Sequence, residues 1–209
     1  MRYYICLVVL LGLFSSCSED ESRSEVFFQE DVEAVSDETV HELKDEEIDF
    51  ADFYYKFSAT IESQNYQIFN GFIHPNLGCY IIESPGAMPV FTNVYDVGEF
   101  VSKSGGQWFF DLPFTQIDHV VSFESLPKVI CEAQAYDKKG CFAGLSEEFK
   151  SSEIWNYAEL SPEENAKVIS SVNSLSISVV NTYNYTFHFS KIESKWYLSF
   201  IDLRVPCSA

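Results

Sequence analysis

Hydrophobic residues between positions 49 and 63 recur at the spacing of a helix. In the stretch "DFADFYYKFSATIES" the apolar positions are Phe50, Phe53, Tyr54, Phe57 and Ile61. Residues at this spacing gather on one face of a helix, so the pattern predicts an amphipathic helix with Asp49 as its N-cap. The following stretch, "SQNYQIFNGFI", predicts a shorter helix of the same kind that ends before His74 and Pro75.

The stretch "SPEENAKVISSVNSL" carries the clearest helix start in the chain. Ser161 is the expected N-cap, Pro162 occupies the first helical position, and Glu164 completes a capping box. The buried stripe that this helix predicts consists of Val168, Ile169, Val172 and Leu175.

Alternation with a period of two marks the C-terminal stretch "NTYNYTFHFSKIESKWYLSFIDL". Its pattern predicts a long antiparallel hairpin with a tight turn around Glu193 and Ser194. In that hairpin Phe189 faces Leu198, Phe187 faces Phe200, and Tyr185 faces Asp202. Shorter strands are expected at "CYII", "HVVSF" and "KVICEAQAY", and a helical piece at "DVGEFVSK".

Together these elements predict an α+β fold, in which N-terminal helices pack on a curved antiparallel sheet that ends in a long C-terminal hairpin. Residues 50–209 would form one such domain. The terminal "KWYLSFIDLRVPCSA" loosely resembles the end of the nuclear-transport-factor-like (SnoaL-like) fold, in which helices cover a strongly curved sheet. The resemblance covers about residues 48–205; it implies a cone-shaped interior and transfers no functional residue.

The first 17 residues have the pattern of an export signal. An apolar run from Tyr3 to Phe14 is followed by two serines and a cysteine, and it is short for a membrane-spanning helix, which needs about 20 residues. "LFSSC" resembles the lipobox of bacterial lipoproteins, although Phe14 departs from the aliphatic residue usual there. The resemblance implies that residues 1–16 are removed and that Cys17 is lipidated. The alternative is an ordinary secreted protein whose cysteine lies there by chance.

Acidic residues dominate the stretch that follows the cysteine. Between Cys17 and Phe50 there are 14 acidic residues and two basic ones, so we expect residues 17–49 to form a flexible, self-repelling tether. "CSEDES" resembles the start of Bacteroidota outer-membrane lipoproteins, in which such acids favour display on the cell surface. The expected location is therefore the outer membrane, through the lipid anchor, with its inner leaflet as the alternative to surface exposure.

The charge and the histidine pattern exclude several function classes. The whole chain has 13 basic and 32 acidic residues, a net charge of −19, which argues against nucleic acid as a partner. The four histidines are scattered without metal-ligand spacing, and no phosphate-binding loop or nucleophile elbow is present. We therefore expect no metal and no cofactor.

Four cysteines remain after Cys17 in an exported chain: Cys79, Cys131, Cys141 and Cys207. They allow three complete pairings. We favour Cys131 with Cys141, because the short stretch between them brings them together without long-range closure. A regular hairpin at Lys138 and Lys139 would instead place Cys141 opposite Tyr136, which argues against this bond.

Two further places are candidate sites. Trp108, Phe109 and Phe110 follow two glycines and would form an aromatic binding loop for a sugar ring, or else pack onto the core. Asp202 beside Tyr185 puts a carboxylate on the apolar face of the predicted hairpin, which indicates either a pocket acid or a satisfied carboxylate at the rim of the sheet.

Two function classes stay open. The first is a non-catalytic surface lipoprotein that binds a glycan or an envelope protein, which the tether and the lack of catalytic motifs favour. The second is a small-molecule enzyme that uses the interior of the cone. A polar cavity with a titratable group would favour the enzyme, and a filled core with an exposed aromatic patch would favour binding.

Overall fold

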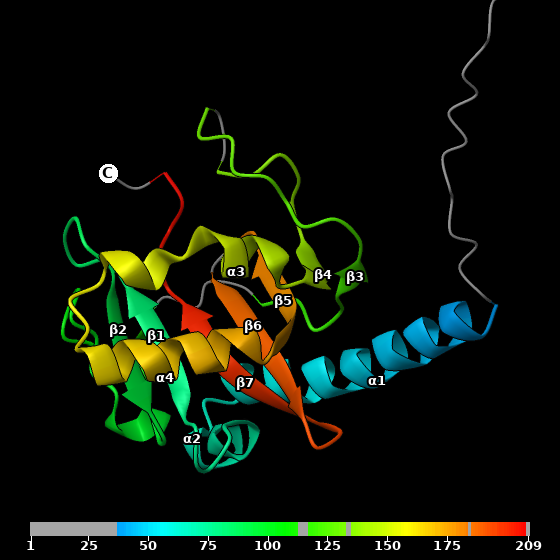
Figure 1. The fold of residues 1–209 in the computed structure, drawn as a ribbon, viewed down its shortest axis with the longest axis horizontal. Coiled ribbons are helices and arrows are strands. Elements are labelled where there is room, and N and C mark those ends of the chain that lie inside the picture. Colours follow the sequence, from blue (N-terminus) through cyan, green and yellow to red (C-terminus); the bar gives the residue numbers. More distant parts are fainter. Residues whose placement is uncertain (1–36, 113–116, 133–134, 184, 208–209) are drawn as a thin grey trace, which may run out of the picture. The chain divides into compact units, whose positions relative to one another are not determined.

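The computed structural model describes residues 37–112, 117–132, 135–183 and 185–207 (Figure 1). The predicted signal peptide (1–16), the lipidation site Cys17 and the tether up to residue 36 lie outside the described residues. Among the described residues, no helix combines the length and the apolar character that crossing a membrane requires.

A sheet of seven strands lies at the centre, in the order β2-β1-β7-β6-β5-β4-β3 (Figure 1). The strands are β1 (Cys79–Glu83), β2 (Val90–Val94), β3 (Ser122–Phe123), β4 (Cys141–Leu145), β5 (Leu175–Asn181), β6 (Thr186–Ile192) and β7 (Lys195–Asp202). The predicted α+β class is confirmed. The predicted all-antiparallel sheet is wrong, because β1 runs parallel to β7 and β3 runs parallel to β4.

Helix α1 (Asp37–Glu62) covers one face of the sheet, followed by the single turn α2 (Tyr66–Phe69). Four of the five residues of the predicted stripe of α1 are buried and the fifth, Phe53, is partly buried. The stripe packs with core residues of β6 and β7 such as Phe187, Phe189 and Leu198. The aromatic rings meet edge to face, with 5.3 Å between the centroids of Phe57 and Phe189.

Helix α1 begins earlier than the sequence pattern predicts, so residues 37–49 of the expected tether are helical. Asp49 is therefore inside the helix and is not its N-cap. Its Oδ2 accepts a hydrogen bond of 2.9 Å from Trp196 Nε1 and lies 3.6 Å from Lys191 Nζ, and Lys191 also pairs with Glu46 at 3.2 Å. These contacts with the hairpin hold the acidic turns of α1 against the sheet, which offsets their mutual repulsion.

The other face of the sheet carries α3 (Glu147–Ser152) and α4 (Pro162–Asn173), and Figure 1 shows both in front of the strands. The predicted capping box is confirmed, with Ser161 as N-cap and Glu164 bonding back to it. A second cluster forms the core here: Phe149, Trp155, Val168 and Val172 pack against Tyr80, Ile82 and Phe200. The sheet is thus packed on both sides by helices.

The hairpin of β6 and β7 has the predicted turn, with positive φ at both Glu193 and Ser194. Phe189 faces Leu198 as predicted. Beyond that pair a bulge interrupts the ladder, so that Phe187 faces Ile201 and Asp202 faces Thr186. The predicted pairs Phe187–Phe200 and Tyr185–Asp202 are wrong, because one extra residue in β7, Ser199, moves everything after it to the opposite face.

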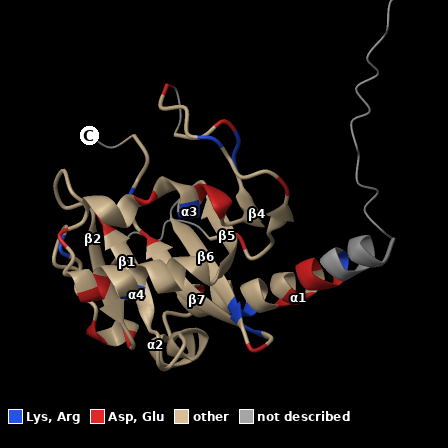
Figure 2. Ribbon diagram, viewed as in Figure 1, with Lys and Arg blue, Asp and Glu red and all other residues tan. Residues whose placement is uncertain are grey.

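Short 3-10 helices and loops join the elements, at Asn70–Phe72, Val97–Glu99, Phe109–Asp111 and Ile154–Tyr157. The expected helix at "DVGEFVSK" is reduced to one of these turns, and the expected strand at "KVICEAQAY" to a single bridge between Val129 and Tyr136. Figure 2 shows acidic residues on helices and loops around the fold, with fewer Lys and Arg between them.

Candidate functional site

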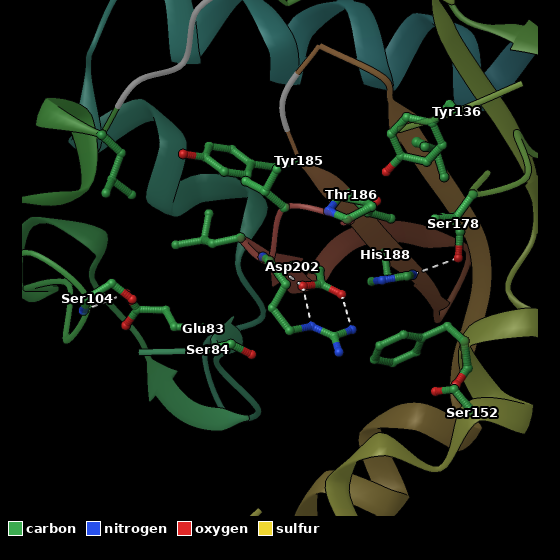
Figure 3. A pocket seen from close by; sticks show the side chains of 18 of the residues that line it. Glu83, Ser84, Ser104, Tyr136, Ser152, Ser178, Tyr185, Thr186, His188 and Asp202 are labelled. Carbon is green, nitrogen blue, oxygen red and sulfur yellow. Dashed lines mark hydrogen bonds and ion pairs between the residues drawn. The ribbon is translucent and has the colours of Figure 1, made fainter. Parts of the chain in front are cut away.

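A cavity of about 780 Å³ lies where the parallel strands β1 and β7 end and β6 begins (Figure 3). One wall comes from the end of β1 and the loop at 102–107. The other comes from β5, β6, α3 and the loop at 126–136. The cavity is rich in polar side chains; those labelled in Figure 3 are Glu83, Ser84, Ser104, Tyr136, Ser152, Ser178, Tyr185, Thr186, His188 and Asp202.

Asp202 and Tyr185, the predicted pocket residues, both line this cavity, although the strand pairing that pointed to them does not form. Asp202 is 8% exposed, and its two oxygens accept from Arg204 Nε at 2.8 Å and from Arg204 Nη2. The backbone N–H of Arg204 donates to Asp202 Oδ1 at 3.0 Å as well. The carboxylate is therefore held as a bidentate ion pair, whose partner the sequence analysis missed.

His188 reaches the same cavity from β6 and is 2% exposed. Its Nδ1 lies 2.6 Å from Ser178 Oγ, and Ser178 donates its hydroxyl hydrogen to Ser146 Oγ at 2.9 Å. Because a serine hydroxyl has one hydrogen, the hydrogen between Ser178 and His188 must come from Nδ1. The other ring nitrogen, Nε2, therefore carries a lone pair and can only accept.

The Nε2 atom of His188 is buried and has no hydrogen-bond partner among the described residues. The Phe149 ring packs against the imidazole with 4.0 Å between centroids. Burial, and after it the positive charge of Arg204, lowers the pKa of His188 to about 3. The imidazole is therefore neutral at physiological pH, and the cavity contains a buried acceptor that nothing in the described chain satisfies.

Glu83, at the end of β1, is the second buried carboxylate of the cavity. It is 3% exposed, and it accepts from Ser102 Oγ at 2.6 Å, from the backbone N–H of Lys103 at 3.1 Å and from that of Ser104 at 3.4 Å. The loop at 102–104 thus wraps its N–H groups around the carboxylate, much as a backbone nest holds an anion. All three of these donors are neutral groups.

The aromatic loop does not form the predicted platform of three rings. Trp108 is 54% exposed, but Phe109 is buried and Phe110 is partly buried. Both phenylalanines pack on Phe69, with centroid distances of 5.1 and 5.8 Å. The alternative, in which the loop packs its aromatics onto the core, holds for two of the three residues.

The predicted Cys131–Cys141 disulfide is wrong: Cys131 is bonded to Cys207, with 5.3 Å between their Cα atoms. Cys141 lies on β4 inside the core, where its thiol is 3.2 Å from Tyr54 Oη and burial raises its pKa to about 11. The bond links the loop at 126–136 to the segment after β7, and both contribute to the cavity wall.

A second constellation, which the sequence analysis missed, joins Ser58, His119 and Glu62. His119 Nδ1 lies 2.8 Å from Ser58 Oγ, and its Nε2 lies 3.2 Å from Glu62 Oε2, an order that resembles a catalytic triad. Ser58 is fully buried within α1 and donates to the Tyr55 carbonyl at 3.1 Å. Its oxygen is therefore inaccessible to a substrate, and the three residues hold the segment around 119 against the helix.

His188, Arg204 and Glu83 are the cavity residues that sequence reasoning missed. Weak signals existed: a histidine between two phenylalanines of the last hairpin, and an arginine two positions after an aspartate. Among the described residues, no group of His, Cys, Asp and Glu is arranged to hold a metal ion. A comparison of the chain with protein-family models, with curated proteins and with solved structures found no match in any of the three.

Proposed function

We propose that this chain is a lipid-anchored envelope protein, exposed at the cell surface, whose globular part is a non-catalytic binding module. The lipobox-like "LFSSC" and the acidic stretch after it support the anchor and the outer-membrane location. The cavity at the end of the sheet supports binding, because it is large enough for a small molecule and concentrates polar groups that point inward.

The observation that carries the proposal is the lone pair on His188 Nε2. A buried polar group without a partner costs about 1–3 kcal/mol, a cost that folded proteins rarely leave in place. An N–H or O–H donor from a ligand in the cavity would remove it once the side chains that cover Nε2, among them the Phe149 ring, move aside. The ligand is therefore a molecule with at least one hydrogen-bond donor.

The charges of the cavity favour an uncharged ligand. Three carboxylates and one guanidinium line it, which disfavours a phosphate or a carboxylate. Neither buried carboxylate is open to a cation, because Arg204 pairs with Asp202 and the loop at 102–104 hydrogen-bonds to Glu83. The third carboxylate, Glu148, is exposed to solvent, where water competes with any ion pair. The groups left for recognition are hydroxyls, the imidazole and the rings of Phe149 and Tyr136, a combination that suits a sugar.

The experiment is a binding titration of the full chain, purified in detergent, against neutral mono- and oligosaccharides of glucose, galactose, mannose and N-acetylglucosamine. His188→Phe keeps a flat ring in the core and removes the acceptor, so we expect it to lower affinity about tenfold, which corresponds to about 1.4 kcal/mol. His74→Phe changes a histidine outside the cavity and should leave affinity unchanged. Failure of every sugar to bind, or equal affinity of His188→Phe, would overturn the proposal.

A small-molecule enzyme is the second candidate, favoured by the presence of a titratable imidazole in a polar cavity. It ranks second because a pKa of about 3 makes His188 a weak base that is not present as the imidazolium, and so is no general acid, at neutral pH. Both oxygens of Asp202 also accept hydrogen bonds from Arg204, so this carboxylate is not free to act as a base. Turnover of a sugar in the same titrations, lost in His188→Phe, would favour the enzyme over the binding module.

The likeness to the nuclear-transport-factor-like fold, with its curved sheet, is likewise our proposal. Helix α1 lies across one face of the sheet, and the cavity opens at one end of it, which supports the general arrangement.

A further inference from the structure

A second hollow adjoins the cavity. It has a volume of about 590 Å³ and lies between the loop at 84–89 and the turn at 154–159. Ser84 and Arg204 line both hollows. Both spaces therefore border these two side chains, one a hydroxyl and the other a guanidinium, which mark the junction between the hollows.

Arg204 can contact a ligand from this junction while it still holds Asp202. Its guanidinium has five N–H groups, and Asp202 accepts from Nε and Nη2. The side chain is 30% exposed, so the remaining N–H groups are within reach of ligand oxygens. Because the ion pair fixes the plane of the guanidinium, those donors are oriented before any ligand arrives.

The second hollow displays an aromatic ring on a rigid support. Tyr157 is 67% exposed, whereas Trp155, two residues earlier in the same 3-10 turn, is buried against Phe149. The turn is closed by hydrogen bonds from the N–H of Asn156 to the Glu153 carbonyl at 2.9 Å and from Ala158 to Trp155 at 3.2 Å. A planar ring held in this way can stack on the apolar face of a sugar at little cost in conformational entropy.

We infer that the two hollows form one elongated site for a linear neutral oligosaccharide. This inference rests on the proposed function. One terminal unit occupies the cavity, displaces the Phe149 ring from the imidazole and donates a hydroxyl hydrogen to His188 Nε2. Ser84 and Arg204 bind the linkage region at the junction, and Tyr157 stacks on a later unit.

The test measures affinity against chain length, with glucose and mannose series from monosaccharide to hexasaccharide and the full chain in detergent. Affinity should rise at least tenfold between the monosaccharide and the longer members of the series that binds. Tyr157→Ala should remove that rise and leave monosaccharide affinity unchanged. Tyr55→Ala, which changes a tyrosine on α1 that is 58% exposed, should behave as the wild type at every length.

Each outcome bears on one of the two proposals. Monosaccharide binding without any gain for longer chains, or a gain that persists in Tyr157→Ala, overturns the elongated site and leaves the proposed function standing. Absence of binding by any member of either series overturns this inference, and it overturns the proposed function as well if the broader sugar panel also fails. Because Tyr157 is mostly exposed, its alanine variant should keep the wild-type unfolding midpoint, which shows that lost affinity reflects lost contact.

Discussion

At the scale of single residues, His188 is a polar side chain among the rings of the second core. Its imidazole packs against Phe149 of α3 and lies opposite Phe200 of β7, and burial keeps it neutral. Its Nδ1 is satisfied by Ser178 and its Nε2 is not. A leucine or phenylalanine would pack here without that cost, so a hydrogen-bond acceptor is what the histidine adds to this core, as the ligand contact that we propose requires.

The buried histidine makes stability depend on pH in a definite direction. In the unfolded chain a histidine has a pKa of about 6.5, so below that pH the unfolded state takes up a proton that the folded state does not. Stability is therefore highest above about pH 6.5 and falls as the pH drops towards the folded pKa of about 3.

Urea unfolding at pH 7 and pH 5 measures this effect. The wild type should lose about 2 kcal/mol more than His188→Phe between the two pH values, by linkage. His74→Phe should retain the loss seen in the wild type. Identical pH dependence in the wild type and in His188→Phe would show that His188 titrates normally.

At the scale of elements, the disulfide unites two segments that have little secondary structure of their own. The loop at 126–136 and the chain after β7 both line the cavity, and the bond closes a loop of 76 residues between them. Closure of so long a loop restricts the unfolded chain strongly, and the same bond holds two parts of the cavity wall together in the folded one.

Removal of the bond should therefore lower both stability and binding. We expect Cys131→Ser and Cys207→Ser each to reduce the free energy of unfolding by about 4 kcal/mol on the chain-entropy estimate, and the double variant to lose no more than either single one. Reductant should shift the unfolding midpoint of the wild type and leave that of the variants in place. An additive loss in the double variant would mean that the cysteines act separately.

At the scale of the whole molecule, the described residues form a cavity-bearing α+β unit that begins with α1. The acidic turns at 37–49 belong to α1, so they are not part of the flexible tether that the sequence predicts. Lys191 and Trp196 of the hairpin bind the acidic side of this helix. The folded unit thus begins with α1, whose first turns carry the last part of the acidic stretch.

Membrane attachment tests the proposed location. Cys17→Ser removes the thiol that would carry the lipid, so the full chain should move from the membrane pellet to the soluble fraction, because each buried methylene of an acyl chain contributes about 0.8 kcal/mol to anchoring. Ser18→Ala, in the next position, should stay in the pellet. Retention of Cys17→Ser in the membrane would rule out a lipid anchor at this residue.

The sequence by itself determined the features that depend on near neighbours. The apolar stripe of α1, the capping box of Ser161 and Glu164, and the turn at Glu193 and Ser194 each arise from interactions within a few residues. These local preferences act in any tertiary context, which is why they could be predicted. The start of α1 was still predicted wrongly, because its acidic residues are held by contacts with the distant β6–β7 hairpin, which the local pattern does not show.

Only the tertiary structure decided the features that depend on distant pairs. The parallel pairing of β1 with β7, the bulge at Ser199 and the bond between Cys131 and Cys207 join segments that no local pattern relates. The cavity follows from all three: strand ends that meet there, an aspartate turned to the other face, and a wall closed by the disulfide. The sequence contains the residues that line the cavity, but only the packing of the chain brings them together. Several strand pairings are equally compatible with the local patterns, and long-range contacts select one of them.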